Sequence, residues 1–148
     1  MRRQRGLTLV ELTVALAVSA LLLSIAVPSY QAIVEGLKVK RAVTDIESLS
    51  LQIERWHTNT FNYPDSLAAA SLDGLSDPWG NPYRYLKIST ANTGQVRRDR
   101  NLRPINNDFD LYSMGKDGRT QTQLQGAKAR DDIVRANNGG YVGLAREY

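Results

Sequence analysis

Apolar residues run from Leu7 to Val27, and Glu11 is the one charged residue in that stretch. A helix of about 20 apolar residues, rising 1.5 Å per residue, is long enough to cross the hydrocarbon core of a bilayer. The pattern therefore predicts an apolar helix over residues 7–28 that can span a membrane. Three arginines precede it, and the positive-inside rule places such an N-terminus on the cytoplasmic side.

After Pro28 the apolar residues recur at the spacings of an amphipathic helix, with charged residues between them. We interpret residues 29–57 as a continuation of the first helix, which Pro28 is expected to kink or loosen. The apolar stripe consists of Ile33, Leu37, Val43, Ile46, Leu49, Ile53 and Trp56. This half of the helix is predicted to pack against another element, with Trp56 in the core.

Turn clusters and short alternating segments follow the helix. Asp65 or Ser66 is expected to cap a short helix that reaches residue 70. Residues 77–82 form a dense turn cluster, and Trp79 is expected to pack beneath the sheet. Alternating residues predict strands at 83–88 and 109–113.

The remaining connections are polar. Residues 89–107 are basic and predict an exposed loop, in which the arginines are solvated or form a patch between subunits. From Gly115 onward the chain is expected to be irregular, apart from the apolar pairs at 133–134 and 141–142. The arginines of the connection at 89–107 are Arg97, Arg98, Arg100 and Arg103. The sequence thus predicts an α+β protein in which a long N-terminal helix packs on a small antiparallel sheet, with an irregular C-terminal loop region.

Charge and composition exclude several classes of function. Without residues 1–6 the chain keeps 16 of its 19 basic residues against 15 acidic ones, so it is nearly neutral and no nucleic-acid partner is expected. It has no cysteine, and therefore no disulfide. No phosphate loop, zinc spacing or nucleophile motif is present, and His57 alone does not make a catalytic site, so we expect no enzymatic activity.

Glu11 is unusual because a carboxylate in an apolar helix is costly in lipid and usually has a partner. Two readings remain open from the residue itself. Glu11 either reaches the membrane interface, or neutralises a cation from a neighbouring subunit, such as an α-amino group created by cleavage after Gly6.

The basic leader, Gly6, Leu7 and Glu11 together resemble the N-terminal signal of type IV pilins and pseudopilins. The resemblance implies that a prepilin peptidase cuts between Gly6 and Leu7 and methylates the new N-terminus. It also implies that Glu11 pairs with the N-terminus of an adjacent subunit during filament assembly. Phe is usual where this chain has Leu7. An ordinary secretory signal with a later cleavage site is the competing interpretation.

The globular part resembles the major pseudopilins of type II secretion systems, known as protein G, over most of its length. The matching segments, in order, are Tyr63-Pro64, 77–85, 110–118 and 131–133. The resemblance implies three segments: a leader peptide at 1–6, a hydrophobic transmembrane and filament-core helix at 7–28, and a periplasmic globular domain at 29–148.

That family has a calcium-binding loop after the second strand. Asp117, Asp131 and Asp132 supply hard oxygen donors in a glycine-bearing segment, although a solvated acidic turn would have the same composition. The resemblance implies calcium ligands at Asp117, Asp131 and Asp132, and at the carbonyl of Met114. An inserted segment, residues 119–130, carries basic residues expected to weaken such a site, and the residues after 133 also depart from the family.

The function implied is that of a pseudopilin, a subunit that polymerises into a periplasmic filament and drives protein export through the outer membrane. Its expected partners are further copies, minor pseudopilins, the prepilin peptidase, an inner-membrane assembly platform and the inner membrane itself. A minor pilin of a type IV pilus or DNA-uptake system is one alternative. A membrane-anchored periplasmic enzyme or binding module is another, of a different class.

Overall fold

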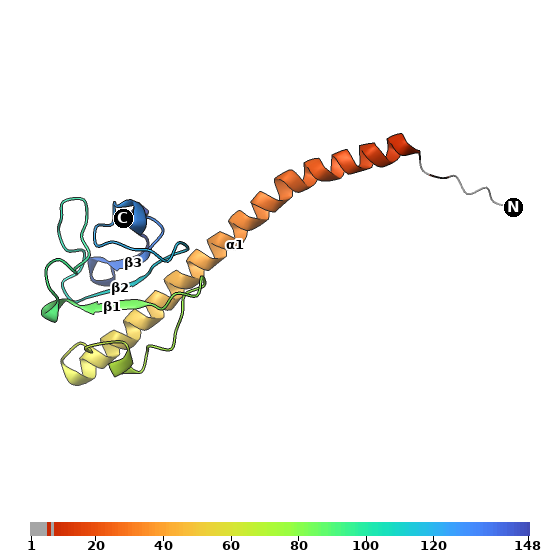
Figure 1. Cartoon of the computed structure of the whole chain (residues 1–148). Coiled ribbons are helices and arrows are strands. Elements are labelled where there is room, and N and C mark those ends of the chain that lie inside the picture. The colour runs from red at the N-terminus through yellow and green to blue at the C-terminus, as the bar shows by residue number, and fades with distance from the viewer. Residues whose placement is uncertain (1–5, 7) are drawn as a thin grey trace. The chain divides into compact units, whose positions relative to one another are not determined.

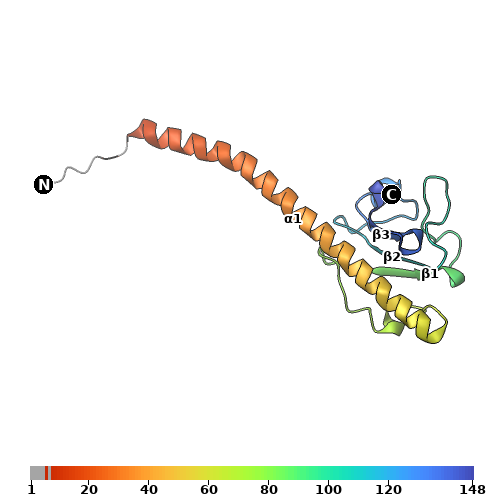
Figure 2. The same cartoon turned by 180° about the vertical axis from the view of Figure 1, so that it is seen from behind.

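The computed structural model describes Gly6 and residues 8–148, while residues 1–5 and 7 lie outside the described part. One long helix, α1 (Leu9–Thr60), is followed by the strands β1 (Arg84–Lys87), β2 (Phe109–Ser113), β3 (Ile133–Ala136) and β4 (Tyr141–Leu144). Short 3₁₀ turns connect them at Ala68–Ala70, Ile88–Thr90, Ala127–Ala129, Asn137–Gly139 and Ala145–Glu147. Figure 1 shows the chain with α1, β1, β2 and β3 labelled, and Figure 2 shows it from behind.

Contacts divide the chain into two units, residues 1–37 and 38–148. In the first unit α1 continues through Pro28, so the proline does not end the helix. Every described residue up to Ile33 is exposed. By length and composition, α1 is long and apolar enough to cross a membrane. Its apolar surface therefore has no partner within the described chain.

The second unit contains a four-stranded antiparallel sheet with the order β1-β2-β3-β4. The register places Tyr85 opposite Leu111 and Tyr112 opposite Val134. In both views of Figures 1 and 2 the yellow C-terminal part of α1 lies along the strands. Because every neighbouring pair in the sheet is joined in sequence order, the architecture is a simple meander.

Each face of the sheet has its own apolar core. On the helix side, the buried residues of α1 pack with alternate residues of β2 and β3. These are Ala42, Ile46, Leu49 and Ile53 from α1, and Phe109, Leu111 and Ile133 from the sheet. On the other side, Val134 and Ala136 pack with Ile105 and Leu124 of the long loops. The predicted α+β fold is confirmed. The helix covers one face of the sheet, and the long loops cover the other.

Several local predictions are confirmed. The strand at 109–113 has the predicted bounds, and the strand at 83–88 is observed over Arg84–Lys87. The two apolar pairs near the C-terminus lie in β3 and β4, which pair with each other. Ser66 Oγ accepts a hydrogen bond from the Ala69 amide at 3.1 Å, and thereby caps the short turn at Ala68–Ala70.

Two predictions are wrong. Trp56 is 36% exposed and lies beside a surface pocket with Tyr63 and Pro64, so it is not a core residue. The chain turns back after α1, and Tyr63 rather than Trp56 packs near the core there, since it stacks on His57 and contacts Phe109. The connection at 89–107 is not simply exposed, because it buries Val96, Arg97, Ile105 and Asn106.

Candidate functional site

The N-terminal site is organised by the first turn of α1. The amide of Thr8 and its hydroxyl each donate a hydrogen bond to Glu11 Oε2, both at 2.8 Å. The Glu11 amide donates in return to Thr8 Oγ1 at 3.2 Å. This reciprocal arrangement is a capping box, which satisfies amide groups that have no partner within the helix. Gly6 is exposed, and Leu7, the other residue of the predicted cleavage site, lies outside the described residues.

Thr8, in the same turn, thus supplies two hydrogen bonds to the Glu11 carboxylate. The Thr-x-x-Glu spacing before an apolar run is the signal that would have revealed this contact. Both bonds go to Oε2, and a carboxylate has about four acceptor sites, so the contact leaves room for a cation. The pairing of Glu11 with a cation of a neighbouring subunit stays a prediction.

The predicted calcium ligands do not share one environment. The Asp117 amide donates to Asp131 Oδ2 at 3.1 Å, which places these two residues together at the surface. Gly115 lies against them, since a Cβ at this position would be 2.3 Å from the Asp131 carbonyl oxygen. Asp132 is completely buried, and Met114 is partly buried. Among the described residues, no group of three or more His, Cys, Asp or Glu side chains is placed to hold a metal ion.

Asp132 instead forms an ion pair with Arg97 inside the protein. The Arg97 Nη2 atom lies 2.8 Å from Asp132 Oδ2, and the two side chains are 3% and 0% exposed. Thr120 donates its hydroxyl to the same carboxylate oxygen at 2.5 Å. Burial raises the pKa of Asp132 to about 6. The charge of Arg97 and the hydrogen bonds from Thr120 and Arg97 lower that pKa, but by less than burial raises it. The prediction of a solvated Arg97 is therefore wrong. Calcium binding stays a prediction, and Asp132 does not fit it.

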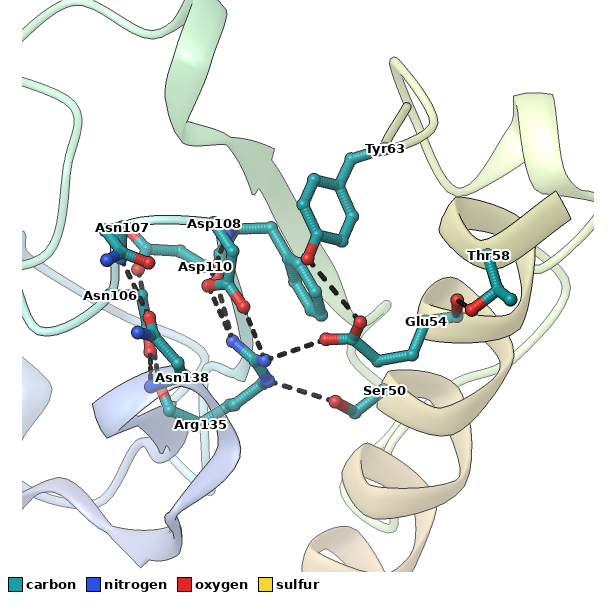
Figure 3. A network of polar contacts seen from close by, with 11 residues as sticks. Ser50, Glu54, Thr58, Tyr63, Asn106, Asn107, Asp108, Asp110, Arg135 and Asn138 are labelled. Carbon is teal, nitrogen blue, oxygen red and sulfur yellow. Dashed lines mark hydrogen bonds and ion pairs between the residues drawn. The ribbon is translucent and has the colours of Figure 1, made fainter. Parts of the chain in front are cut away.

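A second buried arginine joins the helix to the sheet. Arg135 is 1% exposed and binds the Asp108 carboxylate with two nitrogens, at 2.9 and 2.7 Å. It also donates to Ser50 at 2.9 Å and to Glu54 at 3.2 Å, both on α1. Its guanidinium lies 3.9 Å from the centre of the Phe109 ring. Figure 3 shows the group, with Ser50 and Glu54 pointing toward Arg135 from the helix.

Sequence reasoning did not single out Arg135. The signal was the alternation of β3, in which Ile133 and Arg135 fall on the same face of the sheet. Ile133 belongs to the core on the helix side, so Arg135 had to face the helix as well. An arginine at such a position requires buried acceptors, and Asp108 supplies them.

The chain is similar to known proteins at its N-terminus and over most of its length. The family model "Prokaryotic N-terminal methylation motif" matches residues 1–27. The chain is 27% identical over 139 residues to type II secretion system core protein G of Pseudomonas aeruginosa, covering 80% of this chain and 87% of that protein. It is 28% identical over 144 residues to core protein G of Aeromonas hydrophila, covering 82% and 89%.

A pilin also matches. The chain is 25% identical over 148 residues to the type IV major pilin protein PilE of Neisseria gonorrhoeae, covering 95% of this chain and 87% of that protein. In its N-terminal motif and its long helix followed by a four-stranded antiparallel sheet the chain is similar to type IV pilin-like proteins, and over most of its length it is similar to core protein G of type II secretion systems.

Proposed function

We propose that this chain is a pseudopilin of a type II secretion system, a structural subunit that polymerises into a periplasmic filament and drives protein export through the outer membrane. Relatives that cover most of its length are named as core proteins of that system. They are not named as enzymes, which agrees with the lack of a catalytic motif in the sequence.

The observation that carries the proposal is the exposed apolar part of α1, with a single carboxylate in its first turn. Leu9, Leu16 and Leu21 are each more than 60% exposed in the single chain. Burying a leucine side chain contributes about 1.5–3 kcal/mol, so a row of such residues strongly favours an apolar environment. A bilayer provides one before assembly, and a bundle of identical helices provides one afterwards.

Glu11 then sets the register between neighbouring helices in our proposal. Cleavage after Gly6 creates an ammonium group on Leu7, and an adjacent subunit can present that group to Glu11. Within an apolar bundle an unpaired carboxylate is costly. The favourable arrangements of neighbouring helices are therefore those that place the ammonium group of one subunit beside Glu11 of the next. The capping box fixes Glu11 in the first turn beforehand, which reduces the freedom lost on pairing.

The same proposal gives the location and the partners. The chain is inserted in the bacterial inner membrane as a single span with its N-terminus in the cytoplasm, and it passes from there into the filament. A prepilin peptidase cuts and methylates it, and an inner-membrane platform and minor pseudopilins assemble it. The side-chain contacts of the globular part, such as those of Arg97 and Arg135, do not enter this proposal.

Cleavage is tested by mass spectrometry of the mature protein. We expect the mature chain to begin at Leu7, with a methyl group on its amino nitrogen. Substituting Gly6 by a bulky residue, as in Gly6→Leu, is expected to leave the precursor uncut. An intact N-terminus on the wild-type protein would support the uncleaved anchor of an enzyme or binding module instead.

Two substitutions of Glu11 separate its charge from its capping bonds. Gln can replace Glu in a capping box, so Glu11→Gln keeps the helix cap but removes the charge, whereas Glu11→Ala removes both. We expect both variants to insert into the membrane and both to form no filaments on overproduction. The readout is the yield of filaments after shearing, with membrane fractionation as the control. Normal filaments from Glu11→Gln would show that the charge is not required.

A type IV pilus subunit is the second candidate, and the similarity to PilE over 95% of the chain favours it. The two functions differ in what deletion abolishes. Loss of secreted proteins from the medium supports the pseudopilin. Loss of surface filaments with normal secretion supports the pilin.

A further inference from the structure

We infer that Arg97 supplies the positive charge that fastens the loop at 114–132 to the sheet, in the place where the resemblance led us to expect a metal ion. The inference concerns the globular unit alone and does not rest on the proposed assembly. It assigns a buried arginine, from a separate loop, to the neutralisation of Asp132.

The ion pair itself is the first support. Asp132 and Arg97 are almost completely buried, and a buried carboxylate needs a positive partner or hydrogen-bond donors. Arg97 Nη2 and the Thr120 hydroxyl both contact Asp132 Oδ2. Thr120 belongs to the inserted segment at 119–130, so this contact joins the insertion to Arg97 and to Asp132 just before β3.

Arg97 is held in position by its own backbone and by the sheet. Its amide donates to Asp110 Oδ2 at 2.8 Å, and Asp110 lies in β2. Its guanidinium lies over the Tyr112 ring, 3.5 Å from the ring centre. The following residue, Arg98, pairs with the insertion, because its amide donates to the Thr122 carbonyl at 2.8 Å and its carbonyl accepts from Leu124 at 3.1 Å. These contacts hold the guanidinium in the orientation in which it contacts Asp132.

These contacts conflict with a metal ion at Asp132. Asp132 Oδ1 is buried and has no hydrogen-bond partner among the described residues, so it is the one atom that could favour a cation. A cation there would lie within a few ångströms of the guanidinium on Oδ2, and like charges repel strongly in a buried site. The Nε and Nη1 atoms of Arg97 are buried without a hydrogen-bond partner as well, so no acceptor at these two atoms offsets the single positive charge of the guanidinium.

The basic residues of the insertion are not the source of this charge. Arg119, Lys128 and Arg130 are exposed, although the sequence led us to expect them beside the acidic residues. Arg97 is instead 35 positions from Asp132 in sequence. A pattern restricted to the acidic loop therefore could not indicate which cation neutralises it.

Thermal unfolding of the full chain in detergent micelles, followed by near-ultraviolet circular dichroism, tests the inference. We expect the wild-type melting temperature to be the same in EGTA, in millimolar calcium and in millimolar magnesium, within the error of the measurement. A bound ion at a hundredfold excess over its Kd would raise that temperature by about 10 °C or more. A rise with calcium that magnesium does not reproduce would overturn the inference.

Substitutions test the ion pair directly, all in EGTA. Arg97→Met is expected to lower the melting temperature by more than about 10 °C, since it leaves Asp132 buried without its partner. Arg97→Met combined with Asp132→Leu is expected to recover most of that loss, because an apolar pair needs no compensation. Arg100→Met is the control, since Arg100 is exposed in the same loop and its loss is expected to change little.

Two outcomes of the substitutions would contradict the inference. One is an Arg97→Met variant that melts with the wild type. The other is a double variant that is no more stable than Arg97→Met. If Arg97→Met does not fold at all, the double variant and the wild-type metal comparison still decide the question.

Discussion

At the scale of single residues, two buried arginines connect the sheet to the segments that pack on its two faces. Arg135 faces the helix and pairs with Asp108, whereas Arg97 faces the loops and pairs with Asp132. Each also lies over an aromatic ring of β2, Phe109 and Tyr112 respectively. A chain without disulfides thus uses guanidinium groups to connect segments that are far apart in sequence.

Loss of Arg135 is expected to be costly. Arg135→Met should lower the free energy of unfolding by about 3–5 kcal/mol, because the Asp108 side chain is 11% exposed and would lose its partner. Glu54→Gln should cost about 0–1 kcal/mol, since the Glu54 side chain is 41% exposed. Urea unfolding monitored by tryptophan fluorescence measures both. Equal losses in the two variants would show that Arg135 acts mainly through Glu54.

A matched arginine controls for the loss of charge. The Arg146 side chain is 59% exposed, and its Nε atom lies 3.7 Å from Glu147 Oε1. Arg146→Met is therefore expected to leave the free energy of unfolding almost unchanged.

At the scale of elements, the turn after β2 depends on two glycines with left-handed backbone angles. Gly115 has φ +63° and Gly118 has φ +64°, so both favour glycine to a similar degree. Their surroundings differ. A Cβ on Gly115 would lie 2.3 Å from the Asp131 carbonyl oxygen, whereas one on Gly118 would lie 3.1 Å from the Asn81 side chain. Only the first position also fixes a close approach of two backbone segments.

Substituting Gly115 and Gly118 separately by alanine distinguishes the cost of the backbone angle from the cost of the close approach. Gly118→Ala is expected to cost about 1–2 kcal/mol from its backbone angle alone. Gly115→Ala is expected to cost about 1–3 kcal/mol more, because the carbonyl opposite belongs to the backbone and cannot move aside. The measurement is the urea midpoint of each variant. A smaller loss for Gly115→Ala than for Gly118→Ala would contradict the close approach.

The sequence was informative where structure follows from local patterns. The spacing of Ile46, Leu49 and Ile53 predicted the helix, and the alternation at 109–113 predicted β2 with its observed bounds. The contacts of Arg97 with Asp132 and of Arg135 with Ser50 span 35 and 85 positions. Such pairs depend on strand register and loop paths, which no local period encodes. Trp56 was misplaced for the same reason, since its position depends on where the chain returns after α1.

At the scale of the whole molecule, α1 runs through two units that differ in how far its side chains are buried. In the unit at 38–148, one face of α1, formed by Ala42, Ile46, Leu49 and Ile53, is buried against the sheet, whereas every described residue before residue 34 is exposed. The stability of the globular unit should therefore be insensitive to the apolar half. In our proposal that half instead determines insertion and assembly.

A pair of leucines tests this division. Leu49→Ala is expected to lower the free energy of unfolding by about 2–5 kcal/mol, because Leu49 is fully buried. Leu22→Ala is expected to leave it unchanged, since Leu22 is 61% exposed in the single chain. Urea unfolding of the full chain in detergent compares them. A comparable loss in Leu22→Ala would mean that the two halves unfold together.

The short outer strands β1 and β4 have a further consequence for a chain that we propose to polymerise. A sheet edge presents unpaired amide and carbonyl groups, and a second copy can add to it by strand pairing. Here β1 has four residues and begins with the exposed Arg84, and β4 has four residues interrupted by Gly143. Short, charged or glycine-bearing edges resist such pairing. In the assembly that we propose, copies are therefore expected to associate through their helices rather than by pairing of their sheet edges.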